Sequence, residues 1–161
     1  MTPSDLDLIK QAQLQKKELK KKLIGLKKMN SRSLDAIFHE NHIKAFSNRD
    51  CLTCANCCKT TSPIFRDVDV ERISKYLGIK SVNFVSTYLR IDEENDYVLK
   101  SSPCAFLNSD NTCSIYHVRP LACKEYPHTD RKNMYQILDI TAENTSICPA
   151  VAEIVMTFSG K

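Results

Sequence analysis

Apolar residues recur at helical spacing in two N-terminal stretches of the chain, residues 4–29 and residues 34–46. In the first stretch, a thin apolar stripe runs between many lysines, and Ser4 or Asp5 can cap the helix. In the second stretch, Ser33 is the expected cap. The pattern therefore predicts two helices in the first third of the chain.

Shorter elements are expected in the rest of the chain. Helical patterns predict helices over Asp67–Gly78, Ser81–Leu89 and Pro149–Phe158. Alternating segments predict strands over 97–100 and 134–140, and a turn-rich segment predicts a hairpin over 104–116. A proline follows both Arg119 and Tyr126, so no regular helix is expected across that segment. This mixture of short helices and short strands predicts the α+β class.

Eight cysteines carry the strongest chemical signal in the chain. Four lie within eight residues as C-x-x-C-x-x-C-C and four are spread over the remainder: Cys51, Cys54, Cys57, Cys58, Cys104, Cys113, Cys123 and Cys148. A C-x-x-C pair lets two thiolates reach one metal ion from a tight loop, and C-x-x-C-x-x-C is a spacing also used for iron–sulfur clusters. We therefore expect all eight cysteines to be metal ligands.

The start of the chain bears on whether these cysteines form disulfides instead. Residues 1–7 have no basic start and no apolar signal core, and no apolar run in the 161 residues is long enough to span a bilayer. We expect a cytosolic protein in a reducing compartment, where clustered cysteines are more often metal ligands or redox groups. A disulfide between the adjacent Cys57 and Cys58 would also strain the peptide.

The formal net charge of +4 is unevenly distributed. Residues 1–50 hold eleven Lys/Arg and six Asp/Glu, whereas residues 51–161 hold twelve and thirteen. The lysine-rich helix is either a solvated helix at the edge of the domain or a basic arm that docks on an acidic protein partner, on RNA or on a membrane surface. RNA or a ribosome is a weaker alternative, because residues 1–30 lack the aromatic side chains that stack on bases.

These motifs resemble a known family. C-x-x-C-x-x-C-C at 51–58, then Pro103–Cys104, then the Tyr-x-x-Arg-Pro element within Cys113–Pro127, is similar to the bacterial YkgJ-type cysteine-cluster family, also called the CxxCxxCC putative zinc- or iron-chelating domain. The resemblance runs from about Cys51 to Cys148. It implies a cofactor class, an iron–sulfur cluster or zinc, more firmly than a reaction.

The ligand pairing is open at this point. In one arrangement, Cys51, Cys54 and Cys57 hold a [4Fe–4S] cluster with Cys148, which precedes a proline as some ferredoxin ligands do. The other four cysteines then form a second site. In the alternative arrangement, pairs from the tight loop and from the hairpin hold two zinc ions. The crowding of Cys57 against its neighbour slightly favours the polynuclear centre.

Two further residues are candidates for binding the cofactor. Arg119 lies between two cysteines and could offset thiolate charge, bind an anionic ligand, or form a salt bridge with Glu125. Tyr116 is expected to pack over the metal-binding loop. The histidines His39 and His42 are expected to be ordinary residues of a helix face. No phosphate-binding glycine loop, G-x-S-x-G or H-E-x-x-H motif is present, so whether the protein is an enzyme stays open.

The expected protein is thus a small, loop-rich α+β domain held together by metal. We expect residues 1–49 to form a basic helical extension and residues 50–161 to form the cysteine-cluster domain, with short helices and a small hairpin. Its expected role is accessory or redox, as a metal-binding protein. The alternative is a module that docks on a partner or on RNA through its lysine-rich helix and contains structural zinc only.

Overall fold

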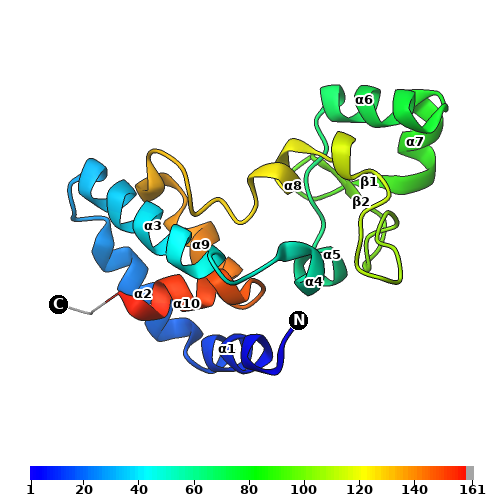
Figure 1. The fold of residues 1–161 in the computed structure, drawn as a ribbon. Coiled ribbons are helices and arrows are strands. Elements are labelled where there is room, and N and C mark those ends of the chain that lie inside the picture. Colours follow the sequence, from blue (N-terminus) through cyan, green and yellow to red (C-terminus); the bar gives the residue numbers. More distant parts are fainter. Residues whose placement is uncertain (159–161) are drawn as a thin grey trace. The chain divides into compact units, whose positions relative to one another are not determined.

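The computed structural model describes residues 1–158, which form helices and one two-stranded antiparallel sheet (Figure 1). This is the α+β class that the sequence predicts. The chain divides into two compact units: a middle unit, Ala55–Tyr126, and a terminal unit that combines Met1–Cys54 with Pro127–Lys161. The domain boundary expected after residue 49 stays a prediction.

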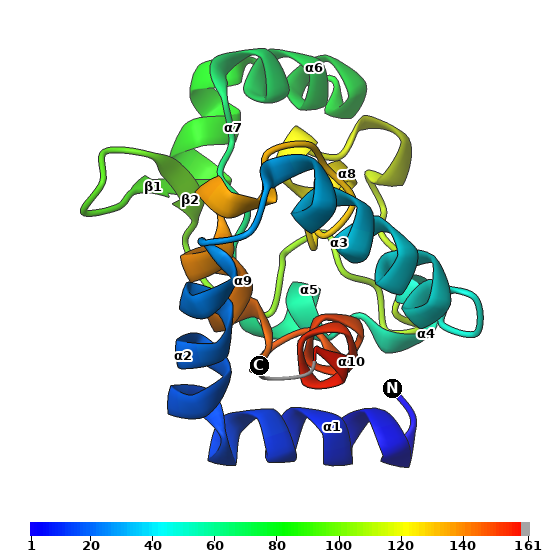
Figure 2. The ribbon, with the colours of Figure 1, turned by 90° about the vertical axis from the view of Figure 1, so that its left-hand side faces the viewer.

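Helices build the terminal unit. They are α1 (Pro3–Leu14), α2 (Lys16–Leu26), α3 (Ser31–Phe46), α4 (Cys51–Cys54), α9 (Leu138–Asn144) and α10 (Pro149–Thr157), with a 3-10 turn η2 (Met134–Gln136). Helix α10 packs against α1 and α3, and Figure 2 shows it almost end-on between them. Its buried residues occur on nearly every side: Pro149, Ala150, Val151, Ala152, Ile154 and Val155. An apolar surface all round suits a helix to the centre of a core.

The single helix expected over residues 4–29 is wrong, because the chain forms two helices with a break at Gln15 (φ −98°, ψ 13°). Helix α1 packs on α10 whereas α2 packs mainly on α9, and the break lets the chain turn from one to the other. The cap also differs from the expectation. Thr2 caps α1, and its side chain and backbone exchange hydrogen bonds with Asp5 in a capping box.

The strand expected over residues 134–140 is also wrong, because this segment forms η2 and the start of α9. Met134 in η2 and Leu138 at the start of α9 are almost fully buried in the same hydrophobic core. The Asp35 carboxylate of α3 accepts the backbone N–H groups of Asn133 and Met134 at 2.8 and 2.9 Å. This contact between distant segments, which local alternation cannot reveal, stabilises the turn.

Two other helices of the terminal unit agree with the sequence prediction. Helix α3 ends at Phe46 as expected, although its cap is Asn30, whose side chain accepts the N–H of Ser33. Helix α10 begins at Pro149 in the position where proline is favoured, and Cys148 directly precedes it. The sequence thus places Cys148 correctly, at the entrance to a helix.

The middle unit contains the sheet. Its elements are α5 (Asn56–Thr60), α6 (Asp67–Leu77), α7 (Ser81–Tyr88), β1 (Leu89–Ile91), β2 (Tyr97–Leu99), the 3-10 turn η1 (Tyr116–Val118) and α8 (Leu121–Glu125). Strands β1 and β2 pair in antiparallel register, with Arg90 opposite Val98. The core beneath them is rich in aromatic residues, and the Phe84 and Phe106 rings stack with centroids 6.0 Å apart.

Most predicted elements of the middle unit are confirmed. Helix α6 ends at Gly78, whose φ of +69° is the left-handed conformation expected for this stop. The hairpin expected over 104–116 is reduced to one antiparallel bridge between Leu107 and Cys113. The expectation that no regular helix forms between the two prolines is wrong, because the short helix α8 begins directly after Pro120, its N-cap, and ends before Tyr126.

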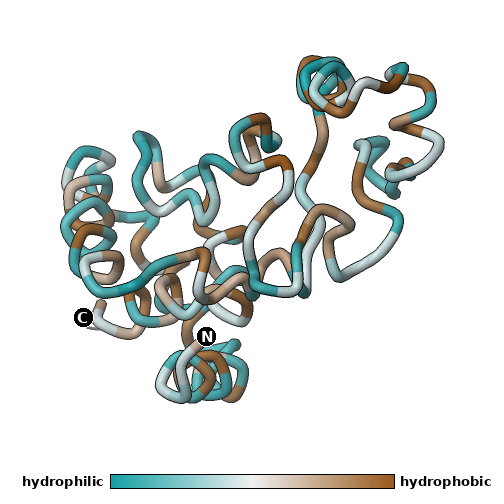
Figure 3. Tube along the Cα trace, turned by 45° about the vertical axis from the view of Figure 1, so that its right-hand side comes forward, coloured by the Kyte–Doolittle hydropathy of each residue, from teal (hydrophilic) through white to brown (hydrophobic). Residues whose placement is uncertain are grey.

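Hydrophilic and hydrophobic residues alternate along the helical turns of the chain (Figure 3). Within residues 1–158, none of the helices combines the length and the apolar character needed to cross a membrane.

Candidate metal centres

Four cysteines of the middle unit lie in three short segments. Helix α5 carries Cys58, the loop between β2 and η1 carries Cys104 and Cys113, and α8 carries Cys123. We call these four the second thiol group. The backbone brings the first two segments together, because the Cys104 N–H donates to the Cys58 carbonyl oxygen at 2.8 Å. All four thiols are free of disulfides.

Apolar anchors hold the loop of the second thiol group. Phe106 and Ile115, each two residues beyond a cysteine, are 5% and 2% exposed in the aromatic core. The Phe106 N–H also donates to the Cys104 sulfur atom at 3.5 Å. Cys104 and Cys113 themselves pack, partly buried, against the same aromatic core, so the anchors fix the backbone that carries these two thiols.

The electrostatics of the second thiol group show that its members influence one another. Burial raises the pKa of Cys123 to about 12, and the charges of Cys58, Cys104 and Cys113 raise it further. Burial likewise raises the pKa of Cys104 and of Cys113, and Cys58 adds to both shifts. Each thiolate is therefore disfavoured by low polarity and by its neighbours. A bound cation would remove both penalties.

Cys58 differs from the other three members. A hydrogen bond with the neighbouring Cys57 thiol lowers the pKa of Cys58 to about 7, against the opposing effect of burial, and the charge of Lys59 helps. Near neutral pH, Cys58 is thus about half ionised. It is therefore the thiol of this group that is already partly ionised and able to bind a soft cation.

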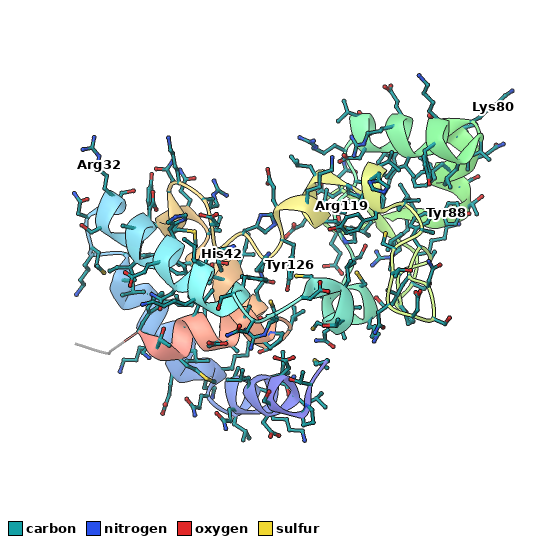
Figure 4. All side chains as sticks on the ribbon, viewed as in Figure 1. Arg32, His42, Lys80, Tyr88, Arg119 and Tyr126 are labelled. Carbon is teal, nitrogen blue, oxygen red and sulfur yellow. The ribbon has the colours of Figure 1, made fainter. Side chains whose placement is uncertain are left out.

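Arg119, which is labelled in Figure 4, acts electrostatically on two of the four thiols of this group. The charge of Arg119 lowers the pKa of Cys113 and of Cys123 against the larger effect of burial. The Arg119 guanidinium carbon stands 3.8 Å from the centroid of the Tyr116 ring, and Nη1 donates to the Tyr116 carbonyl at 2.7 Å. Tyr116 therefore orients the arginine by a cation–π contact and a hydrogen bond.

Three further cysteines lie in the terminal unit, and we call Cys51, Cys54 and Cys148 the first thiol group. Cys51 and Cys54 belong to α4, which begins after Asp50, whose carboxylate accepts the Leu52 N–H at 2.9 Å. Burial raises the pKa of Cys148 to about 11; the backbone amides at the start of α10 oppose the rise, and the charges of Cys51 and Cys54 add to it. These three thiols therefore share one neighbourhood.

The eighth cysteine, Cys57, belongs to α5 in the middle unit and lies next to Cys58. Its place in a ligand set with the first thiol group stays a prediction from spacing. In the part of the chain that the structure describes, no three His, Cys, Asp or Glu side chains form a ready-made metal site. The members of each group lie in the same unit and affect one another's pKa, but their sulfur atoms do not surround a common metal position in the described structure.

The histidines of α3 bind the loop that follows the middle unit. His39 Nδ1 lies 2.6 Å from an Asp130 carboxylate oxygen, and His42 Nδ1 lies 2.8 Å from the Thr129 hydroxyl (Figure 4). Burial lowers the pKa of His42, although the charge of Asp130 opposes this. These contacts are those of helix-face residues that hold a loop, as the sequence analysis expects.

Sequence reasoning missed one pair of residues near the second thiol group. Asp69 of α6 is fully buried, and Arg72 of the same helix donates to its carboxylate at 2.5 Å. Burial acts to raise the pKa of Asp69, but the hydrogen bonds of Arg72 and of the Arg66 and Leu121 amides lower it overall. The Asp-x-x-Arg spacing is common on helices, so nothing local indicates that this pair reaches the cysteine-bearing segment.

Comparison with known proteins identifies a family of domains described as metal-chelating. The family model CxxCxxCC, described as a "Putative zinc- or iron-chelating domain", matches residues 50–149. The matched part is more than half of the chain and contains all eight cysteines. No curated protein and no solved structure matches the chain.

Proposed function

Because the chain belongs to the CxxCxxCC family of putative zinc- or iron-chelating domains, we propose that it binds metal through two separate groups of cysteine thiolates. The first site uses Cys51, Cys54 and Cys148, and the second uses the four members of the second thiol group. Cys57 follows Cys54 at the C-x-x-C spacing, which makes it the remaining expected ligand.

One observation carries this proposal: the middle unit contains four free thiols, and the charge of Cys58 raises the pKa of the other three, Cys104, Cys113 and Cys123. Without a cation, such a group is stable only while most of its thiols stay protonated. Metal binding deprotonates thiols and replaces their repulsion by attraction to a common ion. The donor set therefore fits a soft metal ion, for which thiolates are the preferred ligands.

For the metal, the cysteine spacing favours an iron–sulfur centre over zinc. C-x-x-C-x-x-C with a remote Cys-Pro, here Cys148–Pro149, is an arrangement found in ferredoxins. Such a centre would supply one-electron redox chemistry, which suits an accessory or redox role. Zinc is the alternative, since structural zinc sites are satisfied by four thiolates and stabilise small loop-rich folds.

Arg119 has a defined part in this proposal. Four thiolates around one divalent ion retain a net charge of about −2, which is unfavourable in a partly buried site. Arg119, held in place by Tyr116, offsets part of that charge from beside Cys113 and Cys123. Its role here is electrostatic support of the bound state.

Single serine substitutions test the two-site arrangement. Cys113→Ser removes a ligand from the second thiol group and should remove the metal of that site only. Cys148→Ser should remove only the metal of the first site. Metal content per chain, measured on anaerobically purified protein, should fall by about half in each variant and to near zero in the double variant. Complete metal loss in both single variants, or full retention in both, would contradict two separate sites.

A second candidate function rests on the lysines of α2. Lys16 and Lys27 pair with Glu143 and Asp139 at 2.5 and 3.1 Å. Within residues 1–158, no hydrogen-bonding or ionic partner is found for four exposed lysines of the same region: Lys17, Lys20, Lys21 and Lys28. Lysines three or four residues apart on a helix repel one another, and this repulsion destabilises the helix. An anionic partner bound to these lysines would relieve the repulsion.

The charge of the terminal unit supports the same candidate. It holds fourteen Lys/Arg and ten Asp/Glu, a net of +4, whereas nine of each cancel in the middle unit. Ile24 is 47% exposed on the lysine-bearing helix, and an apolar residue within a charged rim is typical of protein interfaces. We propose an acidic protein surface as the partner of this face, with RNA as the competing occupant.

The docking candidate is tested by charge removal and not by deletion, because residues 1–30 include Leu19 and Leu23 of the core. The triple variant Lys17→Gln, Lys21→Gln, Lys28→Gln should weaken binding of a polyglutamate peptide at low salt several-fold. The matched control replaces the two paired lysines, Lys16 and Lys27, by Gln and should bind as the unchanged protein does. Equal weakening in both, or tighter binding to a 20-nucleotide RNA, would overturn the acidic-protein assignment.

A further inference from the structure

Asp69 has no solvent exposure, and its two carboxylate oxygens accept hydrogen bonds from different parts of the chain. Oδ2 accepts the Arg66 N–H at 3.2 Å and the Arg66 Nε at 3.4 Å, which caps the start of α6. Oδ1 accepts Arg72 Nη2 at 2.5 Å and the Leu121 N–H at 3.3 Å. The capping task needs only the first oxygen, so the second oxygen serves the segment that contains Leu121.

Arg72 holds the same segment from its other side. Its Nη2 atom donates to the Arg119 carbonyl at 3.0 Å, and its Nε donates to the Val118 carbonyl at 3.3 Å. Together with the Leu121 N–H on Asp69, these bonds fix the backbone before and after Pro120. Pro120 itself is buried. A planar guanidinium presents several donors in a rigid fork, which a lysine cannot reproduce.

The fixed segment contains Arg119 and leads directly into the helix that carries one member of the second thiol group. At Leu121 it becomes helix α8, whose third residue is Cys123. Cys123 lies two residues after Leu121, so the bonds that fix the backbone around Pro120 also fix the start of the helix that bears its thiol. The Asp69–Arg72 pair therefore sets the position of a ligand without touching it.

We propose that Arg72, oriented by Asp69, is a positioning residue that places Cys123 and Arg119 for metal binding by the second thiol group. The inference rests on the proposed function, because it concerns one of the two proposed sites. Residues that orient metal ligands from outside typically change metal affinity by 10- to 100-fold when they are replaced.

The test compares two arginines that share one carboxylate. Arg72→Lys keeps the charge beside Asp69 but loses the fork that reaches the Val118 and Arg119 carbonyls. Arg66→Lys is the matched control, because Arg66 pairs with the same carboxylate at 3.4 Å and makes no hydrogen bond to that segment in the described structure. Arg72→Gln, which removes the charge, is a second variant for use if Arg72→Lys fails to fold.

The readout is an anaerobic titration of the full-length, metal-free protein with Co²⁺, followed by the thiolate-to-cobalt absorption. The unchanged protein should show two sites. In Arg72→Lys, one site should weaken roughly tenfold while the other, an internal reference, keeps its affinity. Arg66→Lys should match the unchanged protein. Thermal unfolding of the metal-free variants separates a loss of affinity from a loss of stability.

The outcomes are distinct. Unchanged affinity at both sites in Arg72→Lys and Arg72→Gln would overturn the positioning role, and so would equal weakening by Arg66→Lys, which would indicate helix capping alone. If the unchanged protein binds no Co²⁺ through thiolates, the proposed function itself fails. That result differs from a failure of the positioning role, which leaves binding by the unchanged protein intact.

Discussion

The cysteines of this chain are not equivalent, and the difference arises from their immediate surroundings. Cys58 shares a hydrogen bond with Cys57, which lowers the pKa of Cys58 to about 7, whereas burial raises the pKa of Cys123 to about 12. Residue type and spacing alone identify both as ligand candidates. Their order of ionisation also depends on burial and, for Cys123, on thiols distant in the sequence, which the sequence does not reveal.

A prediction at this scale concerns the protons released on metal binding. At pH 7, Cys58 is about half ionised, while Cys104, Cys113 and Cys123 hold their protons because their pKa values are raised. Binding of Zn²⁺ to the second thiol group should therefore release roughly three to four protons. Because the metal-free group binds more protons than the metal-bound group, apparent affinity should rise with pH across neutral values.

Calorimetry in two buffers with different ionisation enthalpies measures this release directly. Comparing Cys113→Ser with the unchanged protein assigns the protons to the second thiol group. A release of one proton or fewer at pH 7 would mean that the thiols are already ionised, contrary to the electrostatic description given above.

At the level of secondary structure, sequence reasoning succeeded where a helix end depends on one residue. Gly78 indicated the end of α6, and Pro149 indicated the start of α10. It failed where packing of distant segments decides the conformation. The break at Gln15 follows from packing on two different helices, and the helix that begins at Leu138 follows from burial and from the Asp35 contact with the preceding turn.

Two glycines give a matched prediction at this scale. Gly25 lies within α2, and a Cβ atom there would meet nothing within 4 Å, so Gly25→Ala should stabilise the protein by about 0.5–1 kcal/mol. Gly78 has φ +69°, where a side chain is strained, so Gly78→Ala should destabilise it by about 1 kcal/mol. Urea unfolding of both variants at fixed metal content measures the two shifts. Shifts of the same sign would contradict these helix assignments.

For the whole molecule, the sequence predicts a set of ligands but gives no sign of the residues that position them. The set Cys58, Cys104, Cys113 and Cys123 follows from assigning the other four cysteines to a ferredoxin-like pattern, and these four indeed affect one another in the middle unit. Asp69 and Arg72 could not be identified, because their contacts with residues 118–121 span about 50 positions of the chain. Long-range packing of α9 and α10 on the N-terminal helices was equally hidden.

The central claim is that two groups of thiolates in this chain bind a soft metal. Elemental analysis with a visible spectrum, on protein purified without oxygen, tests it most directly. We predict stoichiometric iron, with visible absorption that dithionite bleaches, or in the zinc alternative about two zinc ions per chain and no colour. Well-folded protein that contains neither metal, and whose eight thiols are free or paired in disulfides, would contradict the claim.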